Sequence, residues 1–427
     1  MSCRRAGQFC RKHAAAVLVQ ATMGAILGLL VAKPSVVQAD TRVIPALTIS
    51  ERYDSNVWFY GTPSGATKFD YATNVSPQVN IQHRGRLAEG TITGGGVGEF
   101  YVNNPALNYV GANALMDMKL DQLAQKLDRR LELSASDAFF FTNQLQPFVN
   151  PVAGQSPTFA GSAVGSGIQA FRVTTTANVA KVRTAYNLSP LTSLQATYGS
   201  SFVRFGGTFG DPTLVRTFGI TSHSLTAGPQ WKITPRDTVG ANYAYTTAEF
   251  VFPGGGNGSE ASFSTHGGTA TYTRILTPTL TADFTGGAMV LAQDFGGPNF
   301  LYVTSAALLW NLEENTALTV AYSRAVVPSF FVVPVPLISN VGTLSAQHRL
   351  TEKLRATAVA NFSHNEDTAS IVSYQSYGGT LALSYDLTRS VTTTVSYTYY
   401  NFDSNFPGLR LAFDRNMLMF SIRAAWN

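Results

Sequence analysis

The sequence predicts an all-β protein, a closed antiparallel transmembrane β-barrel of about 18 strands (range about 16 to 18) with short periplasmic turns and longer extracellular loops. Three observations support this prediction. Segments of about ten residues alternate between apolar and hydroxyl side chains. A hairpin phrase recurs along the chain, which indicates a repeated structural unit. An apparent export segment precedes the repeats.

The stretch VTTTVSYTYY, residues 391–400, illustrates the alternation. One side of such a strand carries Val391, Val395 and Tyr397, and the other side carries mainly hydroxyl groups. Hydrocarbon offers no hydrogen-bond partners, so only a closed barrel pairs every backbone group of a sheet that faces lipid. We therefore expect the apolar side to face lipid and the hydroxyl side to face a wet lumen.

The recurring phrase consists of a large aliphatic residue, several turn residues rich in Thr, Ser, Pro or charge, and then an alternating strand. Its aliphatic positions have near-constant spacing: Leu188, Ile233, Leu276, Leu312, Leu350 and Leu387. The residues before each phrase also alternate, so each unit predicts an antiparallel hairpin. Between the units lie longer stretches, FPGGGNGSE from Phe252, DFGGPN from Asp294 and VVPSFFVVPVP from Val326. This asymmetry of turns favours an outer-membrane barrel over a soluble β-sandwich or propeller.

Residues 1–39 have the plan of a secretory signal peptide, and residues 40–427 are predicted to form the barrel. Four basic residues precede an apolar run over residues 14–32, and the small residues before Asp40 predict cleavage after Ala39. The apolar run is somewhat long, which leaves an uncleaved anchor as the alternative.

Composition limits the classes of function. Charged residues make up 13% of the chain, well below the usual share in soluble domains. Residues 1–39 carry five basic and no acidic residues, so 25 residues of each sign remain in the predicted barrel. The high pI therefore does not indicate nucleic-acid binding. Both cysteines, Cys3 and Cys10, lie in the predicted signal peptide, so we expect neither disulfides nor thiolate chemistry in the mature chain.

The first third of the chain is less regular. Strands are expected from Arg42, with Val43, Leu47 and Ile49 facing outward, and from Tyr71. Residues 114–132 fit both a strand and a helix, and we prefer a strand to about Asp121 followed by a turn, because a helix would leave one strand unpaired. The tryptophans suit aromatic girdles at the membrane interfaces: Trp58, Trp231, Trp310 and Trp426.

The longest gap between predicted strands is NQLQPFVNPVAGQSPTFAGSAVGSG, from Asn143. It is rich in Pro, Gly and Ser, and it is expected to be an extracellular loop. It either folds into the mouth of the barrel as a constriction or stays mobile outside it.

The sequence has no strong active-site motif, and we expect neither enzyme activity nor a cofactor. The histidines His83, His223, His266, His348 and His364 lie on different hairpins without metal-ligand spacing. The stretch SHNEDT, from Ser363, gathers His, Glu and Asp, but it is expected to be a solvated charge cluster in an exposed loop. No metal site is predicted.

The lumen is the predicted functional surface. Ten residues are candidates for lining it: Asp117, Lys119, Asp121, Arg130, Glu132, Asn242, Asp283, Arg349, Arg355 and Tyr374. Their charges are mixed in sign, which predicts weak ion selectivity or internal salt bridges that hold the wall together. Lumen residues such as Tyr374, Asn178 and Asn242 would suit sugars through stacking and hydroxyl contacts.

The opening LTISERYDSNVWF, residues 47–59, contains an Asp-x-Asn-hydrophobic step, and hairpins on the pattern Y-x-L-T/S-x-x-T follow it. Together these features resemble the outer-membrane β-barrel porins associated with exopolysaccharide and exosortase-type loci. The resemblance implies an outer-membrane barrel that serves polysaccharide export, and it carries no catalytic residues. The chain departs from the usual terminal aromatic because Asn427 follows Trp426. We interpret the alternation through Phe420, Ile422 and Trp426 as the last strand and the assembly signal, shifted by one position.

Three functions are therefore compared: a porin-like channel for small solutes or saccharide, a plugged barrel that anchors a surface-polymer assembly, and a rim enzyme that would depend on His364 or Asp367. The expected partners are outer-membrane lipid, the barrel-assembly machinery, and saccharide or periplasmic export components, with no nucleic acid. The expected location is the bacterial outer membrane.

Overall fold

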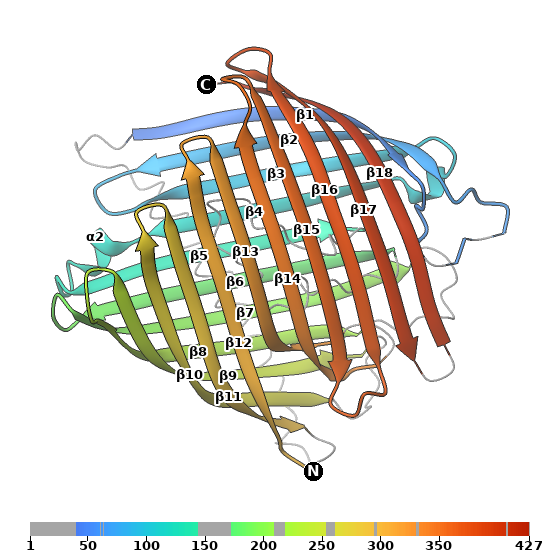
Figure 1. Ribbon diagram of the computed structural model, residues 1–427. Coiled ribbons are helices and arrows are strands. Elements are labelled where there is room, and N and C mark those ends of the chain that lie inside the picture. Colours follow the sequence, from blue (N-terminus) through green and yellow to red (C-terminus); the bar gives the residue numbers. More distant parts are fainter. Residues whose placement is uncertain are drawn as a thin grey trace, which may run out of the picture. The chain divides into compact units, whose positions relative to one another are not determined.

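In the computed structural model, the barrel consists of 18 antiparallel strands in one sheet that closes by pairing of β18 with β1 (Figure 1). The structure describes residues 40–59, 61–62, 64–143, 172–208, 218–252, 261–293, 297–329, 333–406 and 409–426. The expected signal peptide, the 143–167 loop beyond Asn143 and most of the FPGGGNGSE stretch lie outside these residues. The predicted fold class and strand number are confirmed.

The strands are β1 (Asp40–Asp54), β2 (Asp70–Arg84), β3 (Glu89–Tyr101), β4 (Tyr109–Lys119), β5 (Leu131–Thr142), β6 (Val173–Asn187), β7 (Thr192–Thr208), β8 (Gly219–Lys232), β9 (Asp237–Val251), β10 (Ser262–Thr277), β11 (Leu280–Gln293), β12 (Asn299–Glu313), β13 (Thr316–Pro328), β14 (Pro336–Arg349), β15 (Leu354–Asp367), β16 (Ser373–Asp386), β17 (Val391–Phe406) and β18 (Leu409–Ala425). A 3₁₀ turn, η1 (Pro105–Leu107), and a one-turn helix, α2 (Asp121–Ala124), lie between strands. No helix among the described residues is both long and apolar enough to cross a membrane.

The recurring phrase forms the short turns at one end of the barrel. Its hydroxyl side chains have a structural role there, because each accepts a hydrogen bond from a backbone N–H of the turn. Four side chains accept such a bond at 3.0 Å from the residue three positions later: Ser189, Thr234, Thr351 and Thr388. The aliphatic residues before them are exposed on the outer wall, where they mark the membrane boundary of each hairpin.

Alternation along the strands places the two sets of side chains as predicted. On β9, Tyr243 and Tyr245 are exposed on the outer wall, while Asn242 and Ala244, which alternate with them, face the lumen. On β1 and β2, Ile49 and Val79 are exposed on the same outer wall. Their exposure is the expected state of residues that contact lipid in a membrane.

The ambiguous segment 114–132 begins as a strand and continues into a turn, as was preferred because a helix in place of the strand would leave one strand unpaired. Strand β4 ends at Lys119, and helix α2 forms part of the turn before β5. The backbone N–H of Leu133 donates to the carboxylate of Asp121 at 2.8 Å, so Asp121 fixes this turn. Among the described residues, the connection between β4 and β5 is the one at the short-turn end that contains a helix.

Three expectations are wrong, and the first two concern Trp58 and the SHNEDT stretch. Trp58 is buried in the loop after β1, where its indole Nε1 donates to the carbonyl of Thr67 at 3.0 Å, so it is not part of an aromatic girdle. Residues 363–367 belong to β15 and pair with both neighbouring strands, so most of the SHNEDT stretch is not a loop.

Asn178 was expected in the lumen, but it lies on the outer wall. It occupies the same face of β6 as Val182, which is exposed and pairs with exposed Tyr198. Its amide donates to the carboxylate of Asp137 on β5 at 2.9 Å. Asp137 follows the same alternation as exposed Phe141, so an acid–amide pair lies near the middle of the lipid-facing wall.

Candidate functional site

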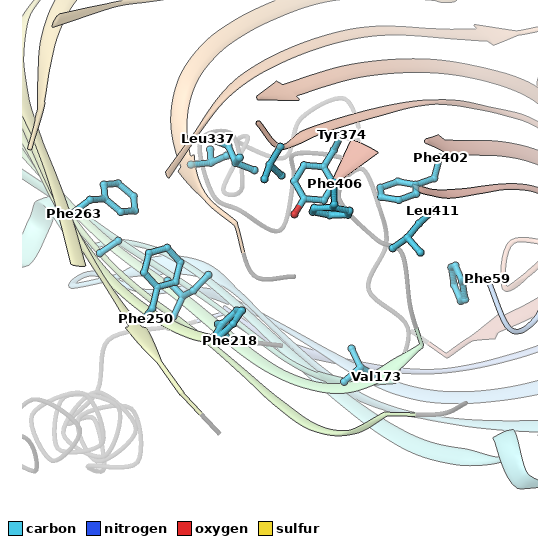
Figure 2. Close-up of a cluster of buried hydrophobic side chains, with 14 of the residues drawn as sticks. Phe59, Val173, Phe218, Phe250, Phe263, Leu337, Tyr374, Phe402, Phe406 and Leu411 are labelled. Atoms are coloured by element: carbon cyan, nitrogen blue, oxygen red, sulfur yellow. The ribbon is translucent and has the colours of Figure 1, made fainter. Parts of the chain in front are cut away.

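The candidate site is the lumen at the end where the longer loops lie. Inward-facing side chains from β6, β8 to β11, β13, β14 and β16 to β18, together with Phe59, Phe218 and Val372 from the connections, form one apolar cluster there, which we call the collar. Figure 2 shows Phe250 and Phe263 on one part of the wall and Tyr374, Phe402 and Phe406 on another. The collar consists of Phe59, Val173, Phe218, Ile220, Ala248, Phe250, Phe263, Leu291, Val327, Leu337, Val372, Tyr374, Tyr400, Phe402, Phe406, Leu411 and Phe413.

The collar departs from the simple pattern of an apolar outside and a polar inside. Along β17, Thr398 faces the lumen at mid-strand, whereas Tyr400 and Phe402 occupy the same inward face closer to the loops. Aromatic rings contact one another across the strands, as in the pair Tyr374 and Phe406 with centroids 5.2 Å apart. The mouth of the lumen is therefore lined by packed aromatic and aliphatic groups.

The segment after β1 contributes to this mouth. Val57 and Phe59 are buried, and the ring of Phe59 makes an edge contact with Phe413 at 5.5 Å. Phe59 has a φ of 65°, a backbone conformation that residues other than glycine rarely adopt. The loop after β1 therefore packs against the collar through the ring of Phe59.

A buried charged cluster adjoins the collar on β1, β3 and β18. Arg52 donates to Glu99 at 2.6 Å, and Arg172 also donates to Glu99, at 3.1 Å. The hydroxyl of Tyr101 bonds to Glu99 and accepts from Arg172. On the same face, Arg415 binds the carboxylate of Asp54. The cluster contains three arginines and two carboxylates, and each carboxylate is paired with an arginine, as expected for ionised groups that are held away from water.

The Asp-x-Asn step of the sequence supports this cluster. Asp54 accepts a hydrogen bond from the backbone N–H of Asn56 at 3.1 Å. The amide of Asn56 donates to the carbonyls of Phe59 and Asp414, at 2.9 and 3.2 Å. The phrase that carried the family resemblance therefore fixes the first loop to the last strand.

The lumen near the short turns is polar. On its wall, Arg183 donates to Gln195 at 2.7 Å, and Gln195 donates to Gln230 at 2.7 Å. Asn187 donates to Glu132 at 2.8 Å. An open cavity of about 480 Å³ at this end is lined by Arg129, Arg130, Glu132, Asn187, Leu188, Ser189, Pro190 and Lys232.

Most of the predicted lumen residues lie on inward-facing positions, but they do not form one site. Strand alternation and pairing direct seven of them inward: Asp117, Lys119, Glu132, Asn242, Asp283, Arg349 and Arg355. Several have structural partners. Asp283 accepts from Thr273 at 2.6 Å, and Arg355 forms an ion pair with Asp386 at 3.2 Å.

The other three predicted lumen residues have different surroundings. Asp121 and Arg130 belong to the connection between β4 and β5 rather than to a strand of the wall. Tyr374 faces inward, but it is only 1% exposed within the collar, and its hydroxyl lies 3.0 Å from that of Ser329. It therefore has no free ring face on which a sugar could stack.

The residues of the rim-enzyme hypothesis lie apart. His364 is on the outer wall, opposite Asn340, whereas Asp367 is on the inward face of the same strand. Within the described ranges, no three His, Cys, Asp or Glu side chains are grouped so that they could hold a metal ion.

Sequence reasoning missed the collar and the charged cluster. The inward positions of the collar are apolar only near the long-loop end of each strand, so alternation gives way there to runs such as VVPSFFVVPVP, from Val326. Such runs were assigned to loops by composition. The charged cluster joins residues that are distant in sequence, and single-strand patterns do not reveal it.

Residues 298–425, which include β12 to β18, match the family described as "Putative beta-barrel porin 2". This match confirms the resemblance to a β-barrel porin family and does not address an exopolysaccharide locus. No curated protein matches the chain.

Solved outer-membrane proteins resemble the chain distantly. OccAB3 of Acinetobacter baumannii is 12% identical, with 90% of this chain and 99% of that chain covered and a TM-score of 0.41. OpdQ of Pseudomonas aeruginosa is 11% identical, with 91% and 98% covered and a TM-score of 0.38.

The closed barrel, its apolar outer wall and the porin-family match identify the chain as a bacterial outer-membrane β-barrel.

Proposed function

We propose that the protein is a channel for small solutes whose outer mouth is restricted by the apolar collar. The collar is the observation that carries the proposal, because it places tightly packed apolar groups at the long-loop end of an otherwise polar lumen. Hydrophobic constrictions limit the flow of water and ions by dewetting. A barrel of this strand number otherwise encloses an aqueous channel.

The polar wall near the short turns supports passage of a hydroxylated or charged solute. Its amides and charged groups, such as Gln195, Gln230 and Lys232, offer both hydrogen-bond donors and acceptors. Saccharide is therefore included in the proposed cargo, and a link to exopolysaccharide export is part of this proposal. The proposed activity is transport without catalysis.

A second candidate is a closed scaffold that anchors surface-polymer machinery. The observation that favours it is the burial of the collar, in which Leu291, Leu337 and Phe402 have no exposed surface. The partners of such a scaffold would be periplasmic export components. The outward residues Phe420, Ile422 and Trp426 on the last strand would serve as the signal for the barrel-assembly machinery in both cases.

Single-channel recording separates the two candidates. The refolded chain that starts at Asp40 is inserted into planar bilayers, and heat-modifiable gel mobility serves as the folding control. Discrete openings, with a current that oligosaccharides block from the short-turn side, are expected for the channel. A folded but electrically silent barrel would instead support the scaffold.

A further inference from the structure

The outer wall carries an arginine in an unusual position. Arg324 pairs with Thr304 on β12 and with Asn340 on β14, and it shares the lipid-facing side of β13 with exposed Val320 and Tyr322. It lies beyond both of these residues toward the long-loop end, which faces outward from the cell. Tyrosines mark the membrane interface, so Arg324 lies at the level of the outer-leaflet headgroups.

The side chain of Arg324 is held in place. Its guanidinium carbon lies 4.2 Å from the centroid of the Tyr302 ring, a cation–π contact. Its Nη1 donates to Oδ1 of Asn340 at 2.9 Å, and the hydroxyl of Tyr322 donates to the same oxygen at 2.9 Å. Two side chains from the neighbouring strands, Tyr302 and Asn340, therefore orient the guanidinium on the outer wall, and Tyr322 of β13 itself holds Asn340.

The charge of Arg324 has no anionic partner in the described part of the chain. None of the ion pairs among those residues includes Arg324. Its Nε–H is shielded from solvent and lacks a hydrogen-bond partner. An uncompensated cation at a lipid-facing position is costly unless a ligand supplies the missing charge.

Two other arginines on the outer wall show the contrast. Arg410 forms an ion pair with Asp403 at 2.6 Å. Arg204 donates to the carbonyl of Ile220 and to the hydroxyl of Thr221, both at 2.7 Å, so the chain itself satisfies its nitrogens. Arg324 differs from Arg410 because it has no acidic partner in the described part of the chain, and from Arg204 because its buried Nε–H has no hydrogen-bond partner there.

We propose that Arg324, oriented by Tyr302 and Asn340, binds a phosphate group on the headgroup of an outer-leaflet glycolipid. A guanidinium matches phosphate oxygens with paired N–H donors, and such charge-assisted bonds are strong. The adjacent tyrosine rings would contact the sugar to which the phosphate is attached. This inference does not depend on whether the lumen conducts.

Native mass spectrometry of the refolded barrel tests the proposal. The probe is lipid A with two phosphates, added in phosphate-free detergent, and its fully dephosphorylated form is the matched ligand control. We expect retention of the phosphorylated lipid to exceed that of the dephosphorylated form by about tenfold or more, the range of one charged hydrogen bond. Equal retention of the two lipids would overturn the proposal.

Three variants locate the site. Arg324→Gln is expected to remove the phosphate preference, and Arg324→Lys to weaken it while keeping the charge, because an ammonium lacks the planar fork. Arg410→Gln is the matched control, since it removes an outward arginine that already has a partner. An equal loss in both Gln variants would show a general charge effect and contradict the site.

A competition experiment with inorganic phosphate distinguishes a lipid phosphate from a free phosphate ion as the ligand. Inorganic phosphate at millimolar concentration should not displace the lipid, because it lacks the acyl chains that hold the headgroup at the wall. Displacement would mean a free-anion site and would overturn the assignment to lipid. Gel mobility establishes that each variant is folded, and Arg324→Lys keeps the test valid if Arg324→Gln does not fold.

Discussion

The guanidinium of Arg415 on β18 and the carboxylate of Asp54 on β1 form a buried ion pair across the closure of the barrel. Nε of Arg415 lies 3.0 Å from Oδ1 of Asp54, although the two residues are 361 positions apart in the sequence. Their side chains are at most 2% exposed. The pair therefore links the first and last strands at the point where the loop after β1 enters the lumen.

Breaking this pair should destabilise the closed barrel. Asp54→Ala leaves the guanidinium of Arg415 buried without its main partner, and we expect a loss of about 3–5 kcal/mol in the free energy of unfolding. Urea titration of the refolded protein in vesicles, followed by gel mobility, measures this change. Asp403→Ala removes the partner of exposed Arg410 and should cost at most about 1 kcal/mol. Equal effects of the two substitutions would argue against a special role of the closure pair.

The collar should limit conductance. Replacing Phe402 and Phe250 together with serine removes two large rings from facing parts of the mouth, and it should increase single-channel conductance because polar groups favour wetting. Phe362→Ser is the control, since Phe362 is exposed on the outer wall. An unchanged conductance in folded collar variants would show that the restriction lies elsewhere.

Ion selectivity should be weak in the native protein and should respond to the short-turn end of the lumen. The inward charges are mixed in sign, so we expect a reversal potential near zero in a potassium chloride gradient. Replacing Arg183 and Lys232 together with glutamate should shift it toward cation selectivity, because both line the polar wall. Arg410→Glu, on the outer wall, should leave the reversal potential unchanged. A shift of equal size there would indicate a surface-charge effect.

The acid–amide pair on the lipid-facing wall predicts two substitutions of opposite effect. Asp137→Leu removes a carboxylate from the lipid face and should increase the free energy of unfolding by about 1–2 kcal/mol. Asn178→Ala leaves Asp137 without its amide donor and should lower it by about 1–3 kcal/mol. The same urea titration measures both. A loss of stability in Asp137→Leu would mean that the carboxylate has a required partner at this wall.

The strand pattern was readable from the sequence because each strand contacts lipid on one side. Tyr243 and Tyr245 alternate with Asn242 and Ala244, and this period of two follows directly from the pleat and the demand for an apolar outer wall. The turn phrase was also readable, because a hydroxyl such as that of Thr351 satisfies turn amides by local bonds. These features depend on residues a few positions apart.

The mouth of the barrel was decided only by tertiary structure. Phe59, Tyr374 and Phe413 come from distant parts of the chain, and the collar exists because closure brings their strands to one end of one lumen. The girdle prediction for Trp58 was wrong, and the close packing around inward-facing Tyr374 was not foreseen, because an inward or interfacial position does not specify what else packs there. The partner of Asp54 likewise depended on closure, because Arg415 becomes its neighbour only when β18 pairs with β1. Local patterns thus determined which way each side chain points, and long-range pairing determined which side chains meet.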